Sequence, residues 1–209
     1  MKLYDSTLAP NPRRVRIFLA EKGIELPRTE VDIGAGENLS PAFLAINPRG
    51  LLPTLVLDDG TVIDESMAIC RYFEELQPEP PLMGSDPREK AIVESWNRHI
   101  EFDGGLPVMD GFRNGHPRFA ERAVAGRAGH AAIPALAERG RQRVAEFYAV
   151  LDERLRLSPY VAGPAFTVAD ITALCIVEFA RTVRMPWPAG LDGLERWHQE
   201  VSARPSAAA

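Results

Sequence analysis

The chain has 209 residues, of which 45% are hydrophobic and 25% are charged, and its formal net charge is −5. This balance is typical of a globular protein with one large or two small domains, and no Lys/Arg-rich run favours nucleic acid as a partner. The start "MKLYDSTL" has no signal-peptide core and the apolar run "ITALCIVEFA" is too short to span a membrane, so we expect a cytoplasmic protein without a membrane partner.

The first 76 residues alternate strand-like and helical patterns. The predicted elements are, in chain order, strand 2–5, helix 12–22, strand 28–33, helical turn 40–47, strands 54–59 and 61–64, and helix 66–76. The last two strands are predicted to form a hairpin that turns at Asp59-Gly60. The order βαβαββα requires a mixed sheet covered by helices, because the first crossover joins a parallel pair of strands.

The rest of the chain has helical patterns only. The segment "QPEPPLMGSDP" holds four prolines in eleven residues, which is typical of a stiff linker. We therefore divide the chain into an α/β domain at 1–76, a linker at 77–87 and an all-helical domain at 88–209. The expected features of the helical domain are helices at 88–103, 134–157 and 191–204, a kink or break at Gly104, Gly105 and Pro107, a loop or broken helix at 113–133, and a frayed end "SAAA".

Two cysteines and one capping motif have structural interpretations. Cys70 and Cys175 both lie in apolar helical patterns, so we expect buried free thiols in a reducing compartment, not a disulfide or a metal site. The motif "TVAD" before an apolar run predicts a capped helix start, in which Asp170 has a structural and not a catalytic role.

The stretch "APNPRRVR" opens the first helix with an unusual charge pattern. Asn11 and Pro12 suit the cap and the first position of a helix. Arg13, Arg14 and Arg16, however, lie near the positive end of the helix dipole, where anions are favoured. Two interpretations stay open: the arginines extend into solvent at a small cost, or the helix start faces an anion that is not part of the chain.

Two further polar corners lie in the same α/β unit. In "NPRGLLPTL" a proline opens a strand, and a cis Leu52-Pro53 bond would expose the N–H and C=O of Leu52, although few X-Pro bonds are cis. In "DESMAI" acidic and hydroxyl residues stand at another helix start, where capping alone explains them. Three polar corners at the ends of neighbouring elements are typical of ligand sites in open α/β folds.

Together these motifs resemble the cytosolic glutathione transferases over nearly the whole chain. The most specific pieces are N-P-x-G-x-x-P at 47–53, the following "DESMAICRYFEE" and "FTVADI", and the start "APNPRRVRIFLAEKGI" is most similar to bacterial and fungal members. The resemblance implies a thioredoxin-like N-terminal domain with a mixed four-stranded sheet and an all-α C-terminal domain. It also implies a homodimer with a role in detoxification that uses glutathione as cosubstrate and no metal.

The resemblance also implies roles for individual residues. Leu52, before a cis Pro53, would pair through its backbone with the cysteinyl part of glutathione. Glu65 and Ser66 would bind the γ-glutamyl end, and Asn38 the glycine carboxylate. The helical domain would supply the wall for the electrophile, with Trp96, His99, Phe102, Phe112 and Arg113 as candidates.

The chain departs from the family at the catalytic position. Many members have a serine where this chain has Ala9, which carries no donor. Asn11 is therefore the implied catalytic residue, with His99 or His116 as alternatives that would act through water. Lowering a thiol pKa from about 8.5 to about 6.5 needs roughly 2.7 kcal/mol. One hydrogen bond to a charged group supplies about 1.5–3 kcal/mol and a helix N-terminus about 0.3–1, so a site without serine can still work.

We therefore expect a glutathione transferase that stabilises the glutathione thiolate for attack on a small, largely apolar electrophile. One alternative is a glutathione-dependent disulfide or peroxide reductase that works without a protein cysteine. Another is a non-catalytic binding protein with the same fold. Ala9 favours the binding protein, while the retained Leu52-Pro53, Glu65 and Ser66 favour an enzyme.

Overall fold

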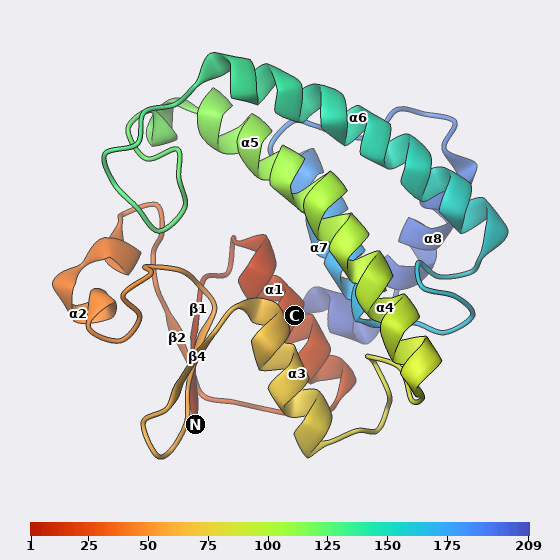
Figure 1. Cartoon of the computed structure of the whole chain (residues 1–209), viewed down its shortest axis with the longest axis horizontal. Coiled ribbons are helices and arrows are strands. Elements are labelled where there is room, and N and C mark those ends of the chain that lie inside the picture. Colours follow the sequence, from red (N-terminus) through yellow and green to blue (C-terminus); the bar gives the residue numbers. More distant parts are fainter.

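The computed structural model describes residues 1–209 and begins with a four-stranded sheet in the order β2-β1-β3-β4 (Figure 1). The strands are β1 (Lys2–Asp5), β2 (Arg28–Glu30), β3 (Thr54–Val56) and β4 (Val62–Asp64). β1 runs parallel to β2 and antiparallel to β3, and β3 and β4 form the antiparallel hairpin. The predicted mixed sheet is confirmed, although β2 is shorter than its pattern.

Helices cover this sheet on the side that faces the rest of the molecule. α1 (Pro10–Glu21) and α3 (Ser66–Leu76) lie between the sheet and the helical part (Figure 1). The short 3-10 helix η1 (Glu37–Leu39) and α2 (Pro41–Leu44) lie at the opposite side of the sheet. The helix predicted at 66–76 is found with those bounds.

The remaining elements are all helical. They are α4 (Pro87–His99), the π-helical turn η2 (Ile100–Gly105), α5 (Leu106–Gly115), the 3-10 helix η3 (Pro117–Phe119), α6 (Pro134–Leu157), α7 (Val168–Thr182), α8 (Asp192–Ser202) and the 3-10 helix η4 (Pro205–Ala208). α4, η2 and α5 follow one another along a single path beside α6 (Figure 1). None of these helices combines the length and the apolar character that crossing a membrane requires.

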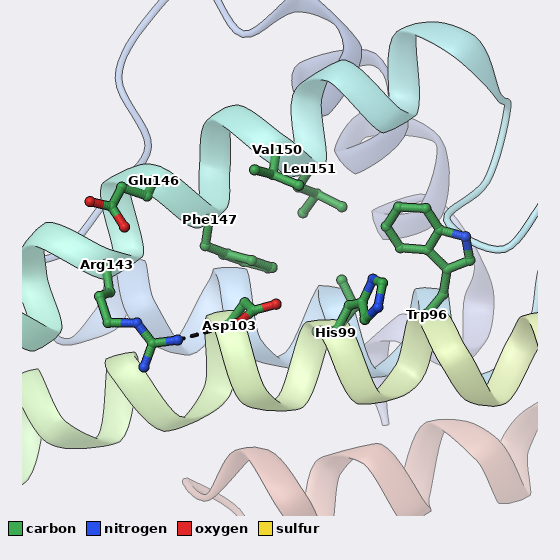
Figure 2. Close-up of a pocket in the computed structure, with 9 residues that line it drawn as sticks. Trp96, His99, Asp103, Arg143, Glu146, Phe147, Val150 and Leu151 are labelled. Atoms are coloured by element: carbon green, nitrogen blue, oxygen red, sulfur yellow. Dashed lines mark hydrogen bonds and ion pairs between the residues drawn. The ribbon is translucent and has the colours of Figure 1, made fainter.

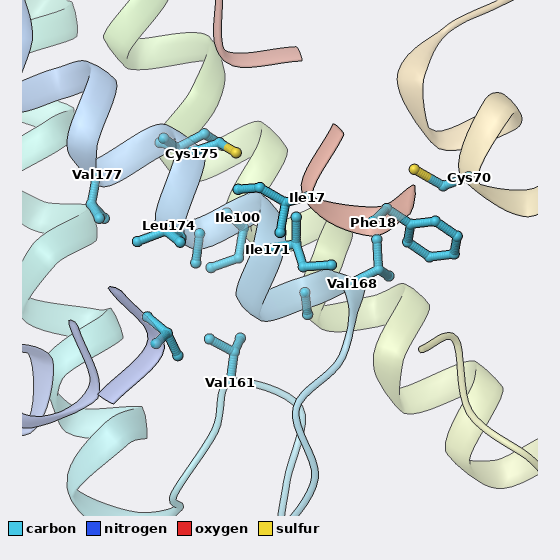
Figure 3. Close-up of a cluster of buried hydrophobic side chains, with 14 of the residues drawn as sticks. Ile17, Phe18, Cys70, Ile100, Val161, Val168, Ile171, Leu174, Cys175 and Val177 are labelled. Atoms are coloured by element: carbon cyan, nitrogen blue, oxygen red, sulfur yellow. The ribbon is translucent and has the colours of Figure 1, made fainter. Parts of the chain in front are cut away.

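One hydrophobic core runs through both parts of the chain. In Figure 3, Ile17 of α1 lies beside Ile171 of the central helix α7, and Phe18 of α1 lies beside Val168. Cys70 and Cys175 are buried free thiols, as predicted. Burial raises the pKa of Cys70 to about 12 and that of Cys175 to about 11, so both stay protonated.

The start of α7 is closed by its own residues. Thr167 and Asp170 form the predicted capping box, in which the Asp170 carboxylate accepts the Thr167 N–H at 3.0 Å. The same carboxylate accepts the Val161 N–H and the Trp197 Nε1–H, both at 2.9 Å. The structural role expected for Asp170 agrees with this arrangement.

Of the kink or break expected at Gly104, Gly105 and Pro107, the break is wrong. A π-helical turn carries the helix through both glycines, and Pro107 lies in the first turn of α5, where a proline is tolerated. The C-terminus, which was expected to fray, does not do so. It forms η4, in which the hydroxyl of the buried Ser206 donates to Glu21, and Arg204 holds the same carboxylate at 2.8 and 2.7 Å.

Candidate functional site

The start of α1 differs from the prediction. Ala9, with φ −94° and ψ 139°, is the N-cap, and Asn11 lies inside the first turn with an exposed side chain. Pro10 and Pro12 carry no N–H, and the Arg13 N–H donates to the Ala9 carbonyl at 3.2 Å. The expected cap at Asn11 is therefore wrong, and the first turn offers a ligand one free backbone N–H and one carboxamide, both from Asn11.

The three arginines of α1 point back into the protein. Arg16 pairs with Asp5 of β1 at 2.6 Å, and Arg14 pairs with Glu101 of η2 at 2.6 Å. Arg13 forms an ion pair with Glu178 of α7. The interpretation that these arginines extend into solvent is thus wrong. The other interpretation, that the helix start faces an anion outside the chain, stays a prediction. Acidic groups of α7, η2 and β1 neutralise Arg13, Arg14 and Arg16.

The second corner, at Leu52, has unused backbone groups. The Leu52-Pro53 bond is cis, and neither the N–H nor the C=O of Leu52 makes a hydrogen bond within the chain. The surrounding loop is firmly held, because the Asn47 amide donates to the Leu51 carbonyl at 3.1 Å and to Thr54 Oγ1 at 2.9 Å. Leu52 can therefore pair with the backbone of a peptide ligand.

The third corner, at the start of α3, is open. Its N-cap Glu65 has φ 69°, a conformation that costs a residue other than glycine about 1–3 kcal/mol, and its side chain does not cap the helix. No acidic residue lies in the first turn, and the N–H groups of Ser66, Met67 and Ala68 have no acceptor in the chain. Ser66 is buried, and its Oγ accepts a hydrogen bond from Arg14 Nη1 at 2.9 Å. These groups together suit an anion.

The Glu65 carboxylate lies beside this corner and is exposed. It contacts Arg49 Nη1 at 2.7 Å, and the same nitrogen contacts Asp64 at 3.0 Å. These two carboxylates raise the pKa of Arg49, with the Glu65 hydrogen bond as the largest cause. A cationic ligand group that binds Glu65 would therefore share this carboxylate with Arg49.

Asn38 has a different place from the other expected glutathione contacts. It is buried, and its amide nitrogen donates to the Gly50 carbonyl at 2.8 Å, while its Oδ1 has no partner. One N–H of the Asn38 amide thus supports the loop of residues 47–53. The contact expected between Asn38 and the glycine carboxylate stays a prediction.

The five residues expected to line the electrophile site do not meet in one pocket. Trp96 and His99 point toward α6 and away from α1, and they line a cavity of about 170 Å³ (Figure 2). Every residue that lines this cavity belongs to α4, η2 or α6. Phe102 is exposed outside it. Phe112 packs against Phe119 and Phe179.

The last of the five, Arg113, makes contacts that hold the loop after α5 in place. It donates to the Arg122 carbonyl at 2.7 Å, and its guanidinium lies 4.6 Å from the centre of the Phe119 ring. The loop that it holds crosses to the N-terminal part, where a side chain at Gly126 would come within 2.2 Å of the Arg49 carbonyl. The sequence could not place this loop, because residues 113–133 have no periodic apolar pattern.

Comparisons with known proteins agree with this fold. Residues 9–76 match the family described as "Glutathione S-transferase, N-terminal domain", and residues 134–200 match "Glutathione S-transferase, C-terminal domain". Glutathione S-transferase 2 of Saccharomyces cerevisiae is 34% identical over 208 residues, which are 99% of this chain and 87% of that protein.

Two solved structures are similar over the whole chain. Gtt2 from Saccharomyces cerevisiae has a TM-score of 0.92 at 33% identity and covers 100% of this chain and 99% of its own. A glutathione S-transferase domain-containing protein from Marinobacter aquaeolei VT8 has a TM-score of 0.89 at 36% identity and covers 99% of both chains. The chain therefore belongs to the glutathione S-transferase family.

Proposed function

We propose that this protein is a glutathione transferase that stabilises the glutathione thiolate beside Asn11 for attack on a small, largely apolar electrophile. The observation that carries the proposal is the set of polar groups without partners at Leu52 and at the start of α3. Glu65 has a strained backbone and Ser66 beside it is buried, so the open polar groups at this corner require an explanation, and a peptide ligand with charged ends supplies one.

The γ-glutamyl and cysteinyl parts of glutathione fit these groups. Its γ-glutamyl α-carboxylate accepts hydrogen bonds from the first turn of α3 and from Ser66, and its amine approaches Glu65. The cysteinyl backbone pairs with the N–H and C=O of Leu52, which places the thiol toward the start of α1. No protein thiol competes as the nucleophile, since both cysteines are buried and protonated.

Asn11 is the residue that we assign to the thiolate. Its carboxamide supplies about 1.5–3 kcal/mol as a donor to a charged acceptor, and the single free N–H with the helix dipole adds about 0.3–1. The sum reaches the roughly 2.7 kcal/mol that a two-unit fall in the thiol pKa requires. The thiolate sulfur then donates an electron pair to form the new bond to carbon. In a substitution the leaving group departs with its bonding electron pair, and in an addition the π electron pair of a double bond moves to the neighbouring atom, which takes a proton.

The absorbance of the thiolate band, followed against pH with bound glutathione, tests this assignment. We expect a thiol pKa well below that of free glutathione for the wild type, and a value raised toward it for Asn11→Ala. Ser66→Ala is the matched control, because it weakens binding but leaves the pKa of the bound thiol unchanged at saturation. An unshifted wild-type pKa contradicts the assignment.

A non-catalytic glutathione-binding protein is the second candidate. The observation that favours it is the poor donor set at α1, where Ala9 has no hydroxyl and two prolines remove N–H groups. Bound glutathione with an ordinary thiol pKa and no conjugation of aryl halides would favour this candidate over the transferase.

A further inference from the structure

Ser66 is held by a residue that is itself anchored in the helical part of the chain. Arg14 Nη1 donates to Ser66 Oγ at 2.9 Å and to Glu101 Oε1 at 2.6 Å. Arg14 and Ser66 are both buried: 4% of the Arg14 side chain and 3% of Ser66 are exposed. Glu101 belongs to the π-helical turn η2, and its Oε2 lies 2.8 Å from Arg98 Nη1.

The bond from Arg14 fixes the direction of the Ser66 hydroxyl proton. A serine hydroxyl has one donor and two acceptor sites, and Arg14 occupies an acceptor site. No group of the chain accepts the Ser66 O–H, so the proton points away from Arg14 and is free for a ligand. The positive charge behind the hydroxyl also strengthens it as a donor to an anion.

Glu101 fixes Arg14 in turn. A buried guanidinium needs a charged partner, and Glu101 is the only carboxylate paired with Arg14. Arg14 Nη1 makes both hydrogen bonds, to Ser66 and to Glu101. The buried Arg14 Nε has no partner. If the charge of Glu101 is lost, no carboxylate holds the Arg14 guanidinium in its position beside Ser66.

We propose that Arg14 and Glu101 are positioning residues for the γ-glutamyl α-carboxylate of glutathione, which they act on through the hydroxyl of Ser66. The inference rests on the proposed function and adds a residue of the helical part to the glutathione site. It means that η2, which lies outside the α/β part, sets part of the affinity for glutathione.

The chain offers a matched control on the same helix. Arg16 is as buried as Arg14, with 6% of the residue exposed, and its Nη1 lies 2.6 Å from Asp5 Oδ1. Arg16 makes no hydrogen bond or ion pair with Ser66 or with the helical part. A merely structural role for buried arginines of α1 predicts the same outcome for variants at both positions.

The test measures binding of two ligands by calorimetry. One is glutathione, and the other is 4-aminobutyryl-cysteinylglycine, which lacks only the α-carboxylate of the γ-glutamyl group. We expect Glu101→Gln to weaken glutathione binding about tenfold, the size of one charge-assisted hydrogen bond, and to change binding of the analogue less than about twofold. Ser66→Ala is expected to abolish this difference, so that the double variant is no weaker than Ser66→Ala alone.

Two further variants keep the test decisive if Glu101→Gln is unstable. Arg14→Lys keeps the buried charge and should show the same selective loss for glutathione, whereas Arg16→Lys should leave both affinities unchanged. In turnover, the KM for glutathione should rise for Arg14→Lys while kcat at saturating glutathione stays constant. Glu101→Asp, which keeps the carboxylate, should recover part of the affinity.

The outcomes separate the inference from the function on which it rests. Equal losses for glutathione and the analogue, or equal effects at Arg14 and Arg16, would overturn the positioning role and leave the glutathione site in place. A wild-type protein that does not bind glutathione would overturn the proposed function and this inference together.

Discussion

The starts of α3 and α7 each carry one acidic and one hydroxyl residue, yet they differ in what satisfies their N–H groups. At α7, Asp170 accepts hydrogen bonds from Thr167, Val161 and Trp197, so the helix start is closed and fully buried. At α3, the N-cap side chain makes no capping bond and the first N–H groups have no acceptor.

This difference indicates that the start of α7 serves the stability of the fold, whereas the start of α3 is a candidate binding site. The groups that complete α7 are all in the chain, and removing any of them leaves buried donors unpaired. The groups that would complete α3 are absent from the chain, and an anionic ligand would supply them. Capping residues in a sequence therefore do not by themselves reveal which helix start faces a ligand.

The largest effect is expected at the closed start. Asp170→Ala leaves the Trp197 Nε1–H and two backbone N–H groups without acceptors in the core, so we expect a loss of about 3–5 kcal/mol in the free energy of unfolding. Urea unfolding measures this loss. Asp192→Ala, which removes an exposed acid from the first turn of α8, is the control and should cost less than about 0.5 kcal/mol. A loss below about 1 kcal/mol for Asp170→Ala would show that α7 does not depend on its cap.

The open start should give the opposite pattern. Ser66→Ala removes a hydroxyl whose proton has no acceptor in the chain, so we expect the free energy of unfolding to change by less than about 1.5 kcal/mol. The dissociation constant for glutathione should rise about tenfold, because the α-carboxylate loses a donor. Calorimetry with glutathione measures it. Unchanged affinity together with a large loss of stability would mean that Ser66 serves folding, as Asp170 does.

The smallest effect concerns the far end of α7 and its dependence on pH. Hydrogen bonds from His198 and then Arg13 hold the pKa of Glu178 below its ordinary value of 4.5. A lowered pKa means that this carboxylate stabilises the fold above pH 4.5, and that the contribution is lost as pH falls through the lower, folded-state value. Glu178→Gln should therefore lower stability by about 1 kcal/mol at pH 7 and flatten its fall below pH 4.5. Thermal unfolding between pH 7 and pH 3 tests this, and parallel curves for both proteins would contradict it.

Local patterns in the sequence were enough to predict much of the fold. The bounds of α3, the hairpin at Asp59-Gly60 and the capping box at Asp170 follow from periodicity, turn residues and spacing within a few residues. The π-helical turn could not be predicted in this way, since Gly104 and Gly105 are as compatible with a break as with a widened turn.

The parts of the site that the sequence did not predict depend on long-range pairs. Arg14 meets Ser66 and Glu101, which lie 52 and 87 positions away along the chain, and no local pattern encodes these contacts. The pattern at "APNP" also suits two different caps, because a proline is favoured in the first helical turn at position 10 as well as at position 12. The first-turn place of Asn11, with its exposed carboxamide, became clear only from the backbone conformation of Ala9.

The most direct test of the central claim is a crystal structure of the protein with glutathione bound. The account predicts the γ-glutamyl α-carboxylate within hydrogen-bond distance of Ser66 Oγ and the first N–H groups of α3, with the cysteinyl backbone paired to Leu52. Glutathione bound elsewhere, such as in the cavity between α4 and α6, with the start of α3 left empty, would contradict the claim that this open helix start is the anion site.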